Sequence, residues 1–334
     1  MAAQAARGQR PPHRAAFRIG DAGIEIASDV PELLDDFESR YGDCAVEAAG
    51  DEADIRCTAT FRPPGAAIRL AFDGPRVPAT FDAVLTPFRM LRHLEGDVGR
   101  ILTFEDDRTL LIDREAAPPD FVTDCVMALV QSVQRGVLFL HAASVGIAGS
   151  GVLLIGASSA GKSTTSLGLA ARGHAFLGDD VAAIRLASRE LLPLPKAARL
   201  RDGPFARSLE PRLRTCRHLR VGGPDGTSRT LVRVGDLFPG SVGGPLPLRY
   251  AFLFERFAAR AAIEPIRPQL ADLTRMKSVV SETIPSWGLS PGRDLMKFLS
   301  ITRLLSALKC YRVELGSTDE TSALIENIVG GVCN

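Results

Sequence analysis

Apolar residues in the middle of the chain recur with two different periods. Between residues 120 and 134 they return at helical spacing and predict one helix. Two apolar runs follow, "VLFLHAASVGI" and "GVLLIG", with the turn-forming sequence "AGSG" between them. The interval 136–161 contains no acidic or basic residue and is long enough to cross a bilayer. Its glycines, serines and histidine favour two buried strands instead.

The second apolar run leads into a strand, loop and helix pattern. Residues 156–161 are glycine- and serine-rich, residues 162–172 are rich in helix formers, and Gly173 is placed to end that helix. The next strand is expected at "AFLGDD", and it ends in two acids, Asp179 and Asp180.

Residues 16–118 mix both periods and predict an accessory α+β domain. Strands are expected at "AAIRLAF" and in a hairpin of "RILTF" and "TLLIDRE", with a solvated acidic tip at residues 105–107. Helical spacing appears in "VPELLDDFESRYG" and in "FDAVLTPFRMLRHLEGD". We expect a disordered tail over residues 1–15 before this domain and a larger domain over residues 119–334 after it.

Arginine dominates residues 199–233, which hold nine arginines and only three acids. Guanidinium groups match carboxylates and phosphates, so the segment would grip an acidic peptide or the phosphates of a nucleotide. A solvated basic loop is the alternative. Further along, strands are expected at "LRYAFLFER" and "YRVEL", a helix over residues 294–308, and a last helix opened by a capping box at Ser317 and Glu320.

Composition limits the classes of function. The chain has 334 residues, of which 46% are hydrophobic and 24% charged, as in globular proteins. A net charge of +1 gives no overall field for a nucleic acid or a membrane, so we expect neither as a partner. Six scattered cysteines without a C-x-x-C pair fit a reducing cytoplasm.

The loop "GASSAGKST" carries the candidate chemistry. Its first eight residues fit G-x-x-x-x-G-K-[ST], a pattern in which backbone amides at a helix N-terminus surround phosphate oxygens. In that pattern the lysine reaches the β- and γ-phosphates and the serine hydroxyl coordinates Mg²⁺. The residues expected to bind the nucleotide are Gly156, Ala157, Ser158, Ser159, Ala160, Gly161, Lys162, Ser163 and Thr164.

The aspartate pair lies where a second metal anchor is needed, at the end of the strand that follows the loop. Neighbouring strand residues point to opposite faces, so both acids can meet the phosphates only if the strand ends there and the chain turns. One acid would then hold Mg²⁺ and the other would accept a proton from an attacking hydroxyl. A solvated strand end is the alternative for one member of the pair.

With these residues in view, "LHAASVGIAGSGVLLIGASSAGKSTTSLGLAARGHAFLGDDVA" resembles the catalytic domain of bacterial HPr kinase/phosphorylase and its HPr-kinase-related relatives. The resemblance is carried by His141, the loop, "RGH" at residues 172–174, and the aspartate pair. It implies an α/β fold, an HPr kinase/PEP-carboxykinase-like P-loop domain with a mixed sheet, preceded by the smaller α+β N-terminal domain.

The same resemblance implies roles and cofactors. Asp179 resembles the general base that activates a serine hydroxyl, and His141 and Lys162 complete the catalytic set. Ser163 and Asp180 would assist Mg²⁺. The implied cofactors are ATP and Mg²⁺, the implied partner is a peptide or protein bearing a serine, and a homo-oligomer is implied by analogy. A histidine in an apolar strand is also common as a hydrogen-bonded core residue, and that alternative stays open.

This sequence departs from the bifunctional members of the family. Ala157 and Thr164 stand where those members usually have Asp and Glu, and their E-I-R-G-x-G-x-x-N-V stretch is not recognisable. The better analogy is with related kinases that phosphorylate a serine of lasso-peptide precursors. A kinase of a small hydroxyl metabolite such as free serine, and a nucleotide-binding scaffold or sensor without transferase activity, are the alternatives.

Overall fold

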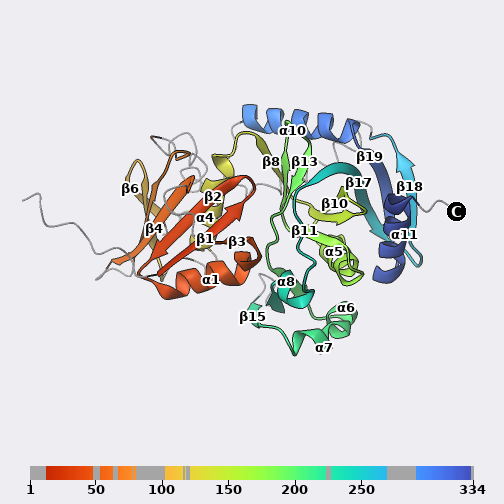
Figure 1. Cartoon of the computed structure of the whole chain (residues 1–334), viewed down its shortest axis with the longest axis horizontal. Helices are drawn as coiled ribbons and strands as arrows, with labels where there is room; N and C mark the ends of the chain where they lie inside the picture. The colour runs from red at the N-terminus through yellow and green to blue at the C-terminus, as the bar shows by residue number, and fades with distance from the viewer. Residues whose placement is uncertain are drawn as a thin grey trace, which may run out of the picture. The chain divides into compact units, whose positions relative to one another are not determined.

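The computed structural model describes residues 13–47, 53–62, 67–77, 79, 102–115, 117, 121–222, 227–268 and 291–331. Contacts divide the chain into two compact units (Figure 1). Unit 1 comprises Met1–Glu38 and Ala45–Gln134, and unit 2 comprises Ser39–Cys44 and Arg135–Asn334.

Unit 1 is built on a sheet whose described strands lie in the order β3-β1-β2-β4-β5-β7-β6. Phe17 and Phe37, 4.9 Å apart between ring centroids, join this sheet to the helix α1. The elements up to residue 134, in chain order, are β1 (His13–Ile19), β2 (Ala22–Ser28), α1 (Pro31–Tyr41), the 3-10 helix η1 (Gly42–Cys44), β3 (Ala45–Val46), β4 (Ile55–Arg62), β5 (Ala67–Asp73), β6 (Leu102–Asp106), β7 (Thr109–Asp113) and α4 (Phe121–Ser132). The end of α1 and all of η1 belong to unit 2 in the contact division.

Most of the elements expected in this region are present. The β6–β7 hairpin, β5, α1 and α4 are confirmed, and the helix expected over residues 81–97 lies outside the described residues. Residues 13–15, expected in a disordered tail, instead belong to β1, because His13 pairs with Ser28 of β2. The contact division falls after α4 rather than before residue 119, because α4 is tied into unit 1 by the Thr123 hydroxyl, which donates to Asp36.

Unit 2 contains a larger mixed sheet, an outlying small sheet and several helices. The elements are β8 (Val137–Leu140), β9 (Ala143–Ile147), β10 (Ser150–Ile155), α5 (Lys162–Ala171), β11 (Ala175–Gly178), β12 (Ala182–Arg185), β13 (Glu190–Leu192), β14 (Ala198–Arg201), α6 (Pro204–Ser208), α7 (Glu210–Leu213), β15 (His218–Gly222), β16 (Ser228–Val232), α8 (Val234–Leu237), β17 (Leu246–Phe257), β18 (Ala262–Ile266), α10 (Pro291–Ser306), β19 (Lys309–Leu315) and α11 (Thr318–Gly330).

The mixed sheet follows the order β11-β9-β10-β17-β13-β12-β8 in the described part of the chain, with β19 and β18 continuing from β17. Strand β17 is parallel to β10 and β19 and antiparallel to β13. The mixed α/β fold predicted from the sequence is confirmed by this topology.

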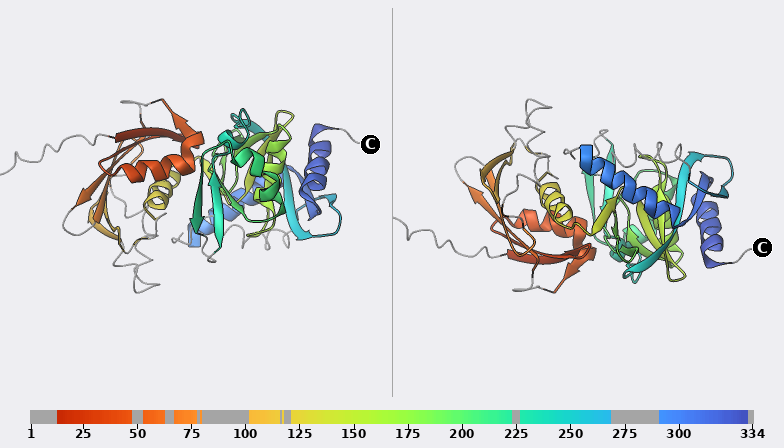
Figure 2. Two further views of the ribbon diagram at one scale, coloured as in Figure 1. Left: turned by 90° about the horizontal axis from the view of Figure 1, so that it is seen from below. Right: turned by 90° about the horizontal axis from the view of Figure 1, so that it is seen from above.

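Alternation along β10 decides which helix covers which face. Leu153 and Ile155 belong to an apolar cluster that includes Ile301 and Leu305 of α10. Val152, Leu154 and their neighbours pack instead with residues of α5 and α11. Figure 2 shows α10 on one face of the sheet and α5 with α11 on the other. Helix α11 begins as predicted, with the Ser317 hydroxyl accepting the amide hydrogen of Glu320.

The expectation of one strand across "VLFLHAASVGI" was wrong. The chain breaks at His141 and Ala142, so that β8 pairs with β12 while β9 pairs with β10 and β11, far across the same sheet. No glycine, proline or charge marks this break in the sequence, because both strands are buried and equally apolar.

Among the described helices, none is both long and apolar enough to cross a membrane.

The arginine-rich segment folds into a small antiparallel sheet, β14-β16-β15, with α6 and α7. Ala198 and Leu200 of β14 face an apolar cluster shared with Leu167 and Ala170 of α5. The segment is therefore packed against the helix that follows the glycine-rich loop, and it is not merely a solvated loop.

Candidate functional site

Strand β10, the loop and α5 form the expected strand, loop and helix. A Cβ on Gly156 would lie 3.0 Å from the Cβ of Phe254, and Gly161 has a φ of 89° with the Leu315 side chain 2.8 Å from where its Cβ would be. Gly161 therefore requires glycine, and at Gly156 a side chain would be closely crowded by its neighbours. No side chain caps α5, so the first amides of this helix remain available to an anion.

Lys162 lies under the loop rather than in solvent. Its side chain is 6% exposed, and Nζ donates to the carbonyl oxygens of Gly156 (2.8 Å) and Ala157 (2.9 Å). The ammonium group thus ties the first part of the loop to the start of the helix. Its positive charge is held where the loop amides converge.

The chain turns at the aspartate pair as expected, because β11 ends at Gly178, just before it. Asp179 is 8% exposed, and its Oδ1 has no hydrogen-bond partner within the described residues. Burial, and next the neighbouring Asp180, raise the pKa of Asp179 to about 6 against a hydrogen bond from Ser163 and the charge of Lys162. A buried carboxylate with an unsatisfied oxygen thus lies against the start of α5.

Asp180 has a different environment from its neighbour. Burial acts to raise its pKa, but the charges of Lys196 and His141 outweigh this effect and leave the pKa below the ordinary aspartate value. Lys196 Nζ lies 3.3 Å from Asp180 Oδ2, and His141 Nδ1 lies 3.0 Å from the Asp180 carbonyl oxygen. His141 therefore contacts Asp180, whereas Asp179 faces the loop.

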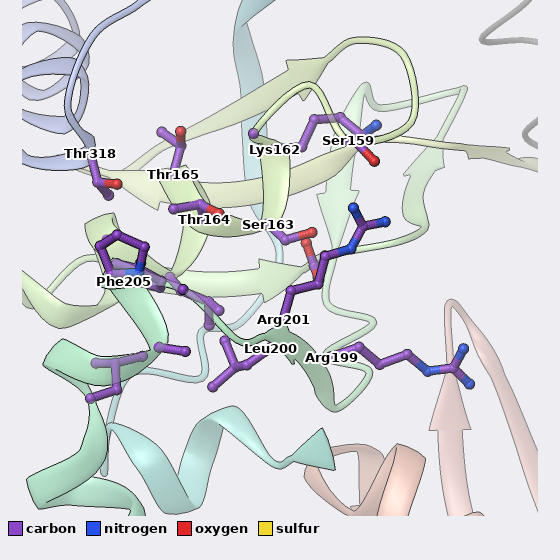
Figure 3. A pocket seen from close by; sticks show the side chains of 18 of the residues that line it. Ser159, Lys162, Ser163, Thr164, Thr165, Arg199, Leu200, Arg201, Phe205 and Thr318 are labelled. Atoms are coloured by element: carbon purple, nitrogen blue, oxygen red, sulfur yellow. The ribbon is translucent and has the colours of Figure 1, made fainter. Parts of the chain in front are cut away.

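The loop and both aspartates line one cavity of about 1210 Å³ within unit 2 (Figure 3). This volume exceeds the 300–1,000 Å³ typical of ligand pockets, so it can hold more than one small molecule. Of the residues predicted to bind nucleotide, residues 158–164 line the cavity. Gly156 and Ala157 do not, and their carbonyl groups instead receive the Lys162 hydrogen bonds.

The oxygen donors at this site fit a magnesium ion. Mg²⁺ prefers hard oxygen ligands and is usually held by one or two carboxylates together with substrate phosphates. The Ser163 hydroxyl and the aspartate pair supply such donors, and the Oδ1 atom of Asp179 has no hydrogen-bond partner among the described residues. No group of three or more His, Cys, Asp or Glu side chains suited to a metal occurs among the described residues. Phosphate oxygens would have to complete the coordination.

One lining residue, Lys196, was not singled out from the sequence, whereas the arginine-rich segment was expected as a whole to contact an anion. Lys196 was missed because it is a lone lysine whose partner, Asp180, is brought to it only by the fold. Arg199, Arg201, Arg212 and Arg229 line the cavity, unlike Arg214 and Arg217 of the same segment. The alternation in "ARLR" was a usable strand signal that would have placed Arg199 and Arg201 on one face.

A glycine-flanked loop between a buried strand and a helix, facing a buried aspartate at the end of β11, defines a P-loop domain of the mixed α/β class. Residues 136–198 match the family model described as "HPr Serine kinase C-terminal domain". The matched segment contains the loop, the aspartate pair, His141 and Lys196, and over this segment the chain is similar to that family.

The chain was also compared with solved structures and with curated proteins. The structure of the HPr(Ser) kinase/phosphatase from Coxiella burnetii is similar at 15% sequence identity and a TM-score of 0.30, over 58% of this chain and 95% of that one. Comparison with curated proteins gives no match.

Proposed function

We propose that this protein is an ATP- and Mg²⁺-dependent kinase that transfers the γ-phosphate to a serine hydroxyl of a peptide or protein. The family match supports kinase or phosphorylase chemistry. One observation carries the finer proposal: the buried Asp179 carboxylate lies against Ser163 at the start of α5 and has a pKa of about 6. A precursor peptide of a biosynthetic cluster is the acceptor that the sequence favours, and assembly into a homo-oligomer stays a prediction.

The loop would bind and orient the phosphates. The free amides at the start of α5 and the positive end of the helix favour an anion at this point. Lys162 is held beside them and would contact the β- and γ-phosphates. Bound Mg²⁺, held by Ser163 and Asp180, would supply charge neutralisation of the phosphate oxygens.

Asp179 would remove the proton from the attacking hydroxyl. Burial raises its pKa, which makes it a stronger base than an exposed aspartate while leaving it mostly ionised at neutral pH. Lys196 and His141 engage Asp180 and keep that second carboxylate charged. The two neighbouring acids thus have pKa values shifted in opposite directions, as expected for different roles.

The test is transfer from γ-³²P-labelled ATP with Mg²⁺ to serine-containing peptides, to free serine and to water. Label in a peptide at well above the rate of hydrolysis is the expected result. Label in free serine alone would make the protein a metabolite kinase. Tight binding of nucleotide with no labelled acceptor of either kind would favour a scaffold or sensor.

The rate of transfer should depend on pH through Asp179. Its base form is required, so kcat/KM should fall tenfold per pH unit below a midpoint near pH 6 and be level above it. The charge of Lys196 lowers the pKa of Asp179, so Lys196→Met should move this midpoint to higher pH. The measurement is kcat/KM from pH 5 to 8 at constant free Mg²⁺. A level profile down to pH 5 would exclude Asp179 as the base.

A further inference from the structure

Phe257 is the most exposed large apolar side chain in the described part of the chain. It is 66% exposed, and it lines the cavity that contains the phosphate-binding loop. A single exposed apolar residue is ordinary on a protein surface and needs no explanation by itself. The position of this ring beside the loop is the observation that points to a ligand.

The sheet fixes Phe257 next to the loop. Phe257 ends β17 and pairs with Leu315 at the end of β19, and the Ala258 amide donates to the Leu315 carbonyl oxygen at 2.8 Å. Two carbon atoms of the ring lie 3.6 Å from the point where a Cβ on Gly161 would be. The ring therefore lies beside the glycine that directly precedes Lys162.

Strand directions place this ring on the side of the loop away from the acids. Strand β9 is antiparallel to both β10 and β11, and β17 is parallel to both β10 and β19. The carboxyl ends of β11, β10, β17 and β19 therefore lie along one edge of the sheet, the edge at which α/β sheets bind ligands. The order β11-β9-β10-β17 puts Asp179, just after β11, and Phe257 on opposite sides of the loop that follows β10.

The two sides of the loop differ in charge. On the side of the acids, Lys196 and Arg199 line the cavity, and both lower the pKa of Asp180. On the other side the lining consists of Phe257 and of residues 315–319 and 321, among which Asp319 is the one charged side chain. An anionic ligand suits the first side, and an uncharged flat ligand suits the second.

The proposed reaction sets the direction in which the nucleotide lies. Its terminal phosphate must lie near Asp179 and Ser163, and the acceptor must approach from the side of the acids. The nucleoside is at the other end of the phosphate chain and would extend past the loop toward Phe257. Figure 3 shows Thr318, which follows β19, and Arg201 of β14 on opposite sides of Ser163.

We infer that Phe257 binds the base of the nucleotide by stacking, and that this ring forms the base-binding end of the cavity. The inference rests on the proposed function and names the residue that holds the nucleoside. Stacking on an aromatic ring suits a base because every base has a flat π-face. A base is favoured over an apolar side chain of the acceptor peptide, because the acceptor reaches the terminal phosphate from the opposite side of the loop.

The experiment measures the affinity of the full chain for ATP, ADP and inorganic tripolyphosphate by calorimetric titration with Mg²⁺ present. Phe257→Ala removes the ring, and Phe257→Trp replaces it with another aromatic surface. Phe61→Ala is the matched control, because Phe61 is 40% exposed and belongs to unit 1. Since Phe257 is largely exposed, Phe257→Ala should melt close to the wild-type temperature, so a loss of binding is not a loss of folding.

Phe257→Ala should weaken the binding of ATP and ADP by about 5- to 100-fold, the range found when an aromatic residue that stacks on a base is replaced by alanine. The affinity for tripolyphosphate should be unchanged, because this ligand has phosphates but no base. Phe257→Trp should retain the affinity for ATP, and Phe61→Ala should bind all three ligands as the wild type does.

Unchanged ATP affinity in Phe257→Ala, or equal losses for ATP and tripolyphosphate, would overturn the inference. A higher KM for a serine-containing acceptor peptide at unchanged ATP affinity would also overturn it, because the ring would then contact the acceptor. Transfer of ³²P is assayed separately. If ATP binds through Phe257 but no acceptor is labelled, the proposed kinase activity fails while the base site stands. If folded wild-type protein binds neither ATP nor tripolyphosphate, both proposals fail.

Discussion

Asp179→Asn is expected to lower phosphoryl transfer by about 10²- to 10⁴-fold, the usual contribution of a positioned general base. Asparagine keeps the size of the side chain but cannot accept the proton. Because the loop amides and Lys162 are unchanged, the affinity for Mg–ATP should stay within a few-fold of the wild-type value. Single-turnover transfer and calorimetric titration with a non-hydrolysable ATP analogue measure the two quantities.

Stability gives an independent readout for the same variant. The pKa of Asp179 rises from 3.8 to about 6 on folding, so its ionised form destabilises the folded state by about 3 kcal/mol. This cost is fully present above pH 6 and disappears below pH 4, where the carboxyl is protonated in both states. Asp179→Asn should therefore unfold at a higher temperature than the wild type at pH 8 and at a similar temperature at pH 4.

Asp180→Asn is the matched control, because the neighbouring carboxyl has a pKa shifted the other way. Its ionised form is stabilised by Lys196, so this variant should lose stability at pH 8, and it should need more Mg²⁺ for transfer. An Asp179 variant that retains wild-type transfer, or that is destabilised at pH 8 as Asp180→Asn is, would contradict the assignment of the base.

Local patterns in the sequence were enough to predict the phosphate-binding part of the fold. Strand β10, the loop and α5 are consecutive, so hydrophobic period, glycine placement and helix signals all apply within one short segment. The turn after Gly178 was also predictable, because two adjacent acids cannot both face one ligand from within a strand. The phosphate-binding loop and the turn that carries the acid pair could therefore both be predicted from the sequence.

Contacts between residues far apart in the sequence could not be predicted from such local patterns. The break at His141 moves β8 and β9 to different parts of the sheet, and only the partners of the two strands reveal it. His141 lies at this break and contacts Asp180, and Lys196 reaches the same residue from the segment between β13 and β14. The arginine-rich segment was left open between gripping and solvated alternatives because charge alone does not show that Ala198 and Leu200 anchor it to α5.

Lys162→Met is expected to lower transfer by about 10²- to 10³-fold, the cost of removing one positioned donor at a developing negative charge. Unlike Asp179→Asn, it should also weaken nucleotide binding, because Nζ both carries charge to the phosphates and ties the carbonyl groups of Gly156 and Ala157. Methionine retains the length of the buried stem, so the apolar packing under the loop is kept.

Lys162→Arg tests the positive charge of this residue separately from the size of its side chain. Arginine keeps the positive charge but is too large for the space in which the lysine is 6% exposed. If charge at the phosphates is the main requirement, Lys162→Arg should retain more affinity for Mg–ATP than Lys162→Met. Dissociation constants for ATP, ADP and adenosine distinguish the cases, since a contact with the phosphates should cost ATP and ADP affinity and leave adenosine unchanged. Equal losses for all three ligands would mean that the variant disrupts the loop, and no loss for any would show that Lys162 does not contact the nucleotide.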